Sequence, residues 1–171
     1  MASGPDPVPG GGSAAAIAAA MAAALAASMA RLSIESWPDG EGVAAQAQTL
    51  RARVEPLAQA DADAYAKVLR RFDHRTDTDL GQALYQAAEL PLEIAELAAD
   101  TATLCALVAD RCDPRLRPDA VAATLLAEAA VRSAAHLVEV NLSAVTNDER
   151  VELARELSDA ATRATARVLA P

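Results

Sequence analysis

The chain has 171 residues, of which 53% are hydrophobic and only 2% aromatic, and its formal net charge is −9. This length suits a single domain, residues 1–171, with a flexible tail at 1–8. The acidic balance argues against nucleic acid and against an anionic membrane as partners, because both need clustered Lys and Arg. Alanine makes up more than a quarter of the chain, which predicts close-packed helices and no strand-rich section.

The first feature along the chain is a glycine-rich stretch, Pro9-Gly10-Gly11-Gly12-Ser13. Ser13 is a favourable N-cap residue, and an apolar run follows it at once. The free amides at a helix N-terminus favour an anion or a developing negative oxygen, so this stretch is a candidate substrate-binding loop. A flexible cap on a buried helix explains the same residues equally well.

The helix predicted over 14–34 carries no charge before Arg31. Its large residues fall four apart on one stripe, namely Ile17, Met21, Leu25 and Met29, and its other faces are nearly all alanine. A helix that is apolar all round is buried, so we expect a central helix whose neighbours can include a second subunit. Alanine contributes little membrane-transfer energy and no aromatic or basic anchors flank the run, which argues against a membrane span.

The second predicted helix covers 43–72, with a kink at Pro56. Asp61 falls on its apolar stripe, where a carboxylate is costly unless it is paired or hydrogen-bonded. Tyr65 lies one turn later and is placed to support it. Asp61 is therefore either a structural helix-to-helix hydrogen-bond partner or a general acid/base.

The third predicted helix covers 78–111, and Pro91 predicts a kink or a break near Leu90. Three arginines then cluster in the connection that follows, either as solvated charges or as a clamp for an anionic ligand: Arg111, Arg115 and Arg117. Two cysteines seven residues apart on this helix are too distant to bridge, which agrees with a reducing cytoplasmic location. No metal-ligand pattern accompanies them.

The fourth predicted helix opens at Asp119 and runs to about Val145, with Asn141 as a second polar residue on an apolar stripe. Asp119 is suited to complement the helix dipole. Thr146 and Glu149 read as a capping box for a fifth helix. The expected fold is an all-α bundle of about five long helices around the alanine-rich central helix.

Several of these segments, taken in order, resemble the cyclodeaminase/cyclohydrolase family. The resemblance spans 9–142 and includes the glycine loop with its alanine helix, Asp61-Ala62-Asp63-Ala64-Tyr65, Leu90-Pro91-Leu92, Pro118-Asp119 and Asn141-Leu142. The family comprises the C-terminal domain of formiminotransferase-cyclodeaminase and methenyltetrahydrofolate cyclohydrolases.

The resemblance implies a cytoplasmic homodimer that acts on a C–N bond of a tetrahydrofolate derivative, without a metal or a covalently bound cofactor. It implies Asp61 as general acid/base, Asn141 as the group that orients water or substrate, and Asp119 as a second carboxylate. Substrate binding would fall to Tyr65 and the 9–13 loop, namely Pro9, Gly10, Gly11, Gly12 and Ser13.

Two alternatives remain at this point. Where the family often has a lysine-rich segment, this chain has Glu35-Ser36-Trp37-Pro38-Asp39, and Leu137 stands where the family has Asn. One alternative is that the same scaffold serves another imine, amidine or cyclic substrate. The other alternative is a non-catalytic helical dimer, in which Asp61 and Asn141 would bond to each other in a closed core.

Overall fold

The computed structural model describes residues 9–72 and 84–170, and all regular structure within these ranges is helical. The tail at 1–8 and His74 lie outside the described residues. The helices are α1 (Gly11–Leu32), α2 (Gly40–Val54), α3 (Leu57–Phe72), α5 (Glu89–Arg111), α6 (Arg117–Asn141) and α7 (Glu149–Leu169). The all-α prediction is confirmed for this part of the chain.

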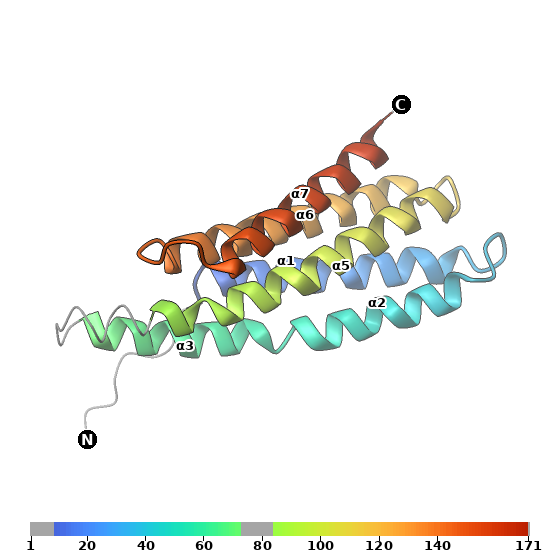
Figure 1. Ribbon diagram of the computed structural model, residues 1–171. Coiled ribbons are helices and arrows are strands. Elements are labelled where there is room, and N and C mark those ends of the chain that lie inside the picture. Colours follow the sequence, from blue (N-terminus) through green and yellow to red (C-terminus); the bar gives the residue numbers. More distant parts are fainter. Residues whose placement is uncertain (1–8, 73–83, 171) are drawn as a thin grey trace, which may run out of the picture.

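The alanine-rich helix α1 is the centre of the bundle, as predicted. It contacts α2, α3, α5 and α6, while α7 packs on α5 and α6 (Figure 1). Ala16, Ala19, Ala23 and Ala26 have no exposed surface. Because alanine has only a methyl side chain, the neighbouring helices can approach α1 closely on three sides.

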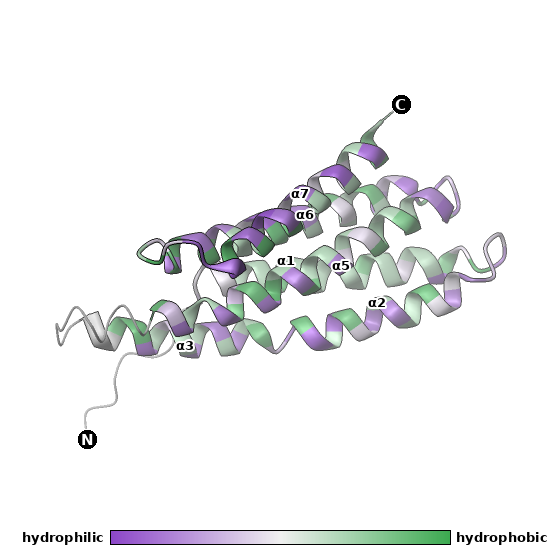
Figure 2. Cartoon of the chain, in the orientation of Figure 1, coloured by the Kyte–Doolittle hydropathy of each residue, from purple (hydrophilic) through white to green (hydrophobic). Residues whose placement is uncertain are grey.

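The large side chains of α1 are placed differently from the prediction. Ile17 and Met21 are 50% and 57% exposed, and Leu25 is half-buried. Only Met29 of this stripe is in the core. The neighbouring helices lie so close to α1 that the core around it has room for methyl groups. The large side chains of the stripe therefore face outward. Figure 2 shows α1 largely white to green along its length.

Two of the helices in the described part of the chain are long and apolar enough to cross a membrane, judged by length and composition alone. They are α1 and α6, with mean hydropathy values of 1.8 and 1.3 over their most apolar windows. Those windows are 56% and 44% buried inside the molecule. Central helices of a bundle pass the same test, so this finding is weak evidence for a membrane span.

The prolines break the helices where predicted. A turn at 55–56 separates α2 from α3, so the predicted kink at Pro56 is a break. Residues 84–87 are helical, a turn follows at Ala88, and Pro91 then lies in the first turn of α5. A proline in the first turn costs no intrahelical hydrogen bond, which explains why the break falls just before it.

Two helix caps differ from the prediction. The N-cap of α1 is Gly10, and Ser13 lies inside the helix at 1% exposure. The N-cap of α7 is Asp148, whose carboxylate accepts a hydrogen bond from the Arg150 amide, so the capping box at Thr146 is wrong. Asn147 has a φ of 60°, and this left-handed residue turns the chain into α7 two residues later than expected.

Candidate active site

Four helix ends and the middle of α3 meet at one end of the bundle, at the left in Figure 1. They are the start of α1, the middle of α3, the start of α5, the end of α6 and the start of α7. The contacts that join them run from Tyr65 to Gly10, from Asp61 to Ser13, from Leu137 to Gly11 and from Asn141 to Ala87. This end contains most of the residues that the sequence singled out.

Asp61 comes from α3 and is held on the first turn of α1. Its Oδ2 accepts a hydrogen bond from the Ser13 amide at 2.8 Å and lies 3.0 Å from the Ser13 hydroxyl. The same hydroxyl is 2.8 Å from the carbonyl oxygen of Ala58, one turn before Asp61. The Ser13 amide has no partner inside α1, so the carboxylate satisfies a free donor and complements the positive end of the helix dipole.

The side chain of Asp61 passes directly over Gly12. A Cβ atom built on Gly12 would lie 2.5 Å from Cγ of Asp61 and 2.8 Å from its Oδ2, with Oδ1 nearer still. None of the described glycines has a positive φ. Gly12 is therefore needed for the space that it leaves and not for its conformational freedom.

Asn141 is the last residue of α6 and is half-buried. Its Nδ2 donates to the carbonyl oxygen of Ala87 at 3.2 Å, which ties the end of α6 to the segment before α5. Leu137, one turn earlier, contacts the α1 N-terminus, since a Cβ on Gly11 would be 3.4 Å from its Cδ1. Asp61 and Asn141 thus have separate partners, unlike the pair that a non-catalytic core would contain.

Tyr65 and Pro9 lie at the rim of this region. Tyr65 is 46% exposed, and a Cβ on Gly10 would be 3.8 Å from its ring. Among the described residues, the hydrogen bonds to Asp61 come from Ser13, so Tyr65 does not support the carboxylate as predicted. Pro9 is exposed. Both residues remain available to a ligand.

Asp119 does not join Asp61 and Asn141 within one chain. It is exposed in the first turn of α6, whereas Asn141 ends the same helix. Twenty-two residues at about 1.5 Å each separate them by about 33 Å. Within one chain the structure therefore does not bring this second carboxylate to Asp61, because sequence spacing alone does not show which end of a bundle a helix start occupies.

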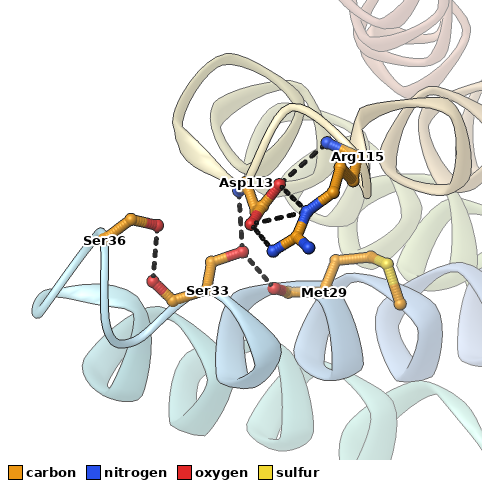
Figure 3. A network of polar contacts seen from close by, with 5 residues as sticks. All are labelled: Met29, Ser33, Ser36, Asp113 and Arg115. Carbon is orange, nitrogen blue, oxygen red and sulfur yellow. Dashed lines mark hydrogen bonds and ion pairs between the residues drawn. The ribbon is translucent and has the colours of Figure 1, made fainter.

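The arginine cluster also lies at the far end, where other partners engage it. Figure 3 shows Arg115 paired with Asp113, with an Nη2 to Oδ2 distance of 2.6 Å, and this ion pair lowers the pKa of Asp113 to about 2. The amide of Asp113 donates to the Ser33 hydroxyl at the end of α1. Arg117 donates to the carbonyl oxygen of Val168, and Arg111 is exposed. This cluster joins helix ends and does not reach the Asp61 region of its own chain.

One cluster beside the candidate site was not predicted. Arg150 donates to both carboxylate oxygens of Asp148, to Glu89 and to the carbonyl oxygen of Tyr85, and its guanidinium lies 4.1 Å from the Tyr85 ring centroid. Hydrogen bonding to Asp148 raises the pKa of Arg150 further. Asp148 and Arg150 are two residues apart in the sequence, and this spacing could have predicted their ion pair. The contact with Tyr85 could not be predicted from neighbouring residues, because Tyr85 is 65 positions away. Among the described residues, no group of three or more His, Cys, Asp or Glu is arranged for a metal ion.

Comparison with known proteins gives a consistent result. The formiminotransferase-cyclodeaminase family model matches residues 1–160. The chain is similar to the solved structure of formiminotetrahydrofolate cyclodeaminase from Thermotoga maritima, with 24% identity and a TM-score of 0.83, over 95% of this chain and 87% of that one. No curated protein sequence matches the chain. At this identity the structural likeness concerns the fold, while the family model covers nearly the whole sequence, and the chain belongs to the formiminotransferase-cyclodeaminase family.

Proposed function

We propose that this protein is a folate one-carbon enzyme that acts on a C–N bond, of the methenyltetrahydrofolate cyclohydrolase or formiminotetrahydrofolate cyclodeaminase type. Family membership supports the substrate class. The observation that carries the proposal is the half-buried carboxylate of Asp61, held by hydrogen bonds at the start of the central helix. A carboxylate fixed in this way on rigid elements suits proton transfer.

The proposed chemistry requires Asp61 to accept and return one proton. In the cyclohydrolase reaction, water adds to the methenyl carbon and Asp61 takes a proton from it. The proton then goes to the ring nitrogen whose bond to that carbon breaks, the formyl group remains on the other nitrogen, and the second proton of water is released to solvent. In the cyclodeaminase reaction, a folate nitrogen attacks the formimino carbon, and Asp61 carries the proton of this nitrogen to the formimino nitrogen. A second proton, taken up from solvent, completes the ammonia as its bond to the carbon breaks and the methenyl cation forms.

Asn141 has the supporting role in this proposal. Its amide nitrogen is used by the Ala87 carbonyl, so its amide oxygen can accept a hydrogen bond from water or substrate. The exposed ring of Tyr65 provides a flat apolar surface at the rim, suited to contact with an aromatic ring system. Gly10, at the start of α1, lies beside the Tyr65 ring.

We also propose that the protein acts as a homodimer and that the exposed face of α1 forms the interface. Ile17 and Met21 border an open groove of about 320 Å³ toward α2, which is also lined by Ala20, Ala24, Arg51 and Glu55. No charge occurs on α1 before Arg31. A face one helix long, about 33 Å, and two helices wide, about 20 Å, covers roughly 650 Å² per subunit, near the area that a stable dimer buries.

A second candidate function is the same scaffold acting on another imine, amidine or cyclic substrate. The observation that favours it is Leu137, which places an apolar side chain against Gly11 beside the Asp61 carboxylate. This neighbour offers no hydrogen bond to a polar folate ring. In this case the proton-transfer role of Asp61 is kept and the substrate changes.

Two assays on the wild-type protein test the proposed function. The first follows the near-ultraviolet absorbance of 5,10-methenyltetrahydrofolate, and the second follows ammonia release from formiminotetrahydrofolate. We expect acceleration of at least one reaction, together with folate binding by calorimetry. If neither reaction is accelerated and no folate binds, the folate proposal is wrong and the second candidate takes its place.

A further inference from the structure

We propose that Ser13 and Gly12 are positioning residues for Asp61: together they fix one carboxylate oxygen on α1 and leave the other oxygen as the proton-transfer atom. This inference rests on the proposed function and assigns a different role to two residues that the sequence had suggested as substrate-binding. It follows from how the carboxylate is held.

The Oδ2 atom of Asp61 is anchored on Ser13. The Ser13 amide donates to this oxygen at 2.8 Å, and the Ser13 hydroxyl, whose single proton is shared with the carbonyl oxygen of Ala58 at 2.8 Å, lies 3.0 Å from it. Ser13 itself is 1% exposed and cannot rotate freely among the alanines of the core. The amide and the shared hydroxyl, both on one rigid residue, therefore define the direction of the carboxylate group.

Gly12 is the second residue that positions the carboxylate. The carboxyl group of Asp61 occupies the space where any other residue would have its Cβ. An alanine at this position would push the carboxylate away from Ser13 and break the anchoring. A displacement of about 1 Å at a reacting group can reduce a catalytic rate about a hundredfold.

The remaining carboxylate oxygen of Asp61 is Oδ1. Among the described residues no hydrogen bond reaches this atom, which lies over the backbone of Gly12. It therefore keeps its lone pairs for a proton of water or substrate. The Ser13 donors are directed to Asp61 and to the carbonyl oxygen of Ala58, which leaves the substrate to other groups at this end of the bundle.

The experiment compares Ser13→Ala and Gly12→Ala with two glycine controls on α2. A Cβ on Gly40 would lie 2.6 Å from the carbonyl oxygen of Ala30, so Gly40→Ala introduces a comparable clash far from Asp61. A Cβ on Gly42 meets nothing within 4 Å, so Gly42→Ala tests the glycine replacement alone. The values of kcat and KM, the thermal midpoint and the helical content are measured for all four variants.

We expect Ser13→Ala to lower kcat about tenfold and Gly12→Ala about a hundredfold, with KM and helical content close to wild type. Gly40→Ala should lower the thermal midpoint but keep kcat per folded molecule. The inference is overturned if Ser13→Ala keeps the wild-type kcat, or if Gly12→Ala loses no more kcat than Gly40→Ala. If the wild-type protein shows no turnover, the proposed function is wrong, and this inference fails with it.

Discussion

At the scale of single residues, burial decides the chemistry of the two cysteines. Cys105 has no exposed surface on α5, and its thiol lies 3.7 Å from the carbonyl oxygen of Ala22 on α1. Burial raises the pKa of Cys105 to about 12 and also raises that of Cys112. Because the thiolate is the reactive form, both side chains are protected in the folded protein.

We therefore predict that neither cysteine reacts with a thiol reagent at pH 8 until the protein unfolds. The measurement is a time course with a chromogenic disulfide reagent, with and without denaturant. Two equivalents should appear in denaturant and almost none without it. Rapid modification of one equivalent in the native protein would show that one of the two thiols is not protected by the fold.

The Asp61 site shows what a single sequence can reveal at this scale. A carboxylate on an apolar helical stripe is costly, so its need for a partner was predictable from Leu57, Asp61 and Ala64 alone. The partner was not predictable, because Ser13 is 48 positions away and its amide is free only as a result of where α1 begins. A contact of this kind depends on how α3 packs on α1, which local patterns do not encode.

At the scale of helices, proline and glycine set the boundaries, and these were largely predictable. The breaks before Leu57 and before Glu89 follow from Pro56 and Pro91. The orientation of α1 was predicted less well, since its large residues were expected inside. In an alanine-rich bundle the smallest side chains fill the narrow space between helices, so size is a poor guide to burial here.

The close packing around α1 predicts a strong asymmetry between alanines. Ala23→Leu adds three carbons at a fully buried position and should destabilise the protein by roughly 1–3 kcal/mol. Ala52→Leu makes the same change on the exposed side of α2 and should have little effect. Urea unfolding of both variants tests this. Equal stabilities would mean that the helices around α1 are less tightly packed than the structure shows.

The first turn of α7 gives a second prediction for a helix. Asp148 caps this helix and also pairs with Arg150, so Asp148→Ala should lower the thermal midpoint by a few degrees. Thr146→Ala is the matched control, because Thr146 lies outside the helix and is exposed. Calorimetry distinguishes the two. A larger decrease of the thermal midpoint in Thr146→Ala than in Asp148→Ala would support the capping box that the sequence suggested.

The carboxylate of Asp148 also makes the stability of the protein depend on pH in the acidic range. Hydrogen bonding from Arg150 lowers the pKa of Asp148 to about 2 from an ordinary value of 3.8. A carboxyl whose folded pKa is lowered stabilises the protein fully above the unfolded value, and this contribution is lost as the pH falls from about 4 to about 2. Asp148→Asn should therefore lose less stability over this interval than wild type. Parallel curves for the two proteins would contradict the ion pair.

At the scale of the whole molecule, one face of the bundle stands out. The acidic charge of the chain is carried by the other helices, while α1 presents Ile17 and Met21 to solvent without a charged neighbour on its own surface. These exposed apolar side chains lie beside a groove that Arg51 and Glu55 of α2 border, and an apolar strip with a charged rim supports the proposed dimer.

We predict that Met21→Glu converts a dimer into a monomer while the helical content is kept. Leu169→Glu is the control, since Leu169 is 56% exposed on α7, a helix that does not pack on α1. Light scattering after size-exclusion chromatography measures both masses. The dimer interface is elsewhere if both variants remain dimers, and a wild-type monomer would remove the proposed dimer altogether.

The most direct test of the whole account is the turnover of 5,10-methenyltetrahydrofolate and formiminotetrahydrofolate by wild type and Asp61→Asn. The asparagine keeps the shape of the side chain and an oxygen for Ser13, but it cannot carry the proton. We predict that the variant keeps its helical content and loses at least a hundredfold in kcat on the substrate that wild type accepts. Full activity in Asp61→Asn would show that the carboxylate at the start of α1 is structural and that the proton is carried by another group.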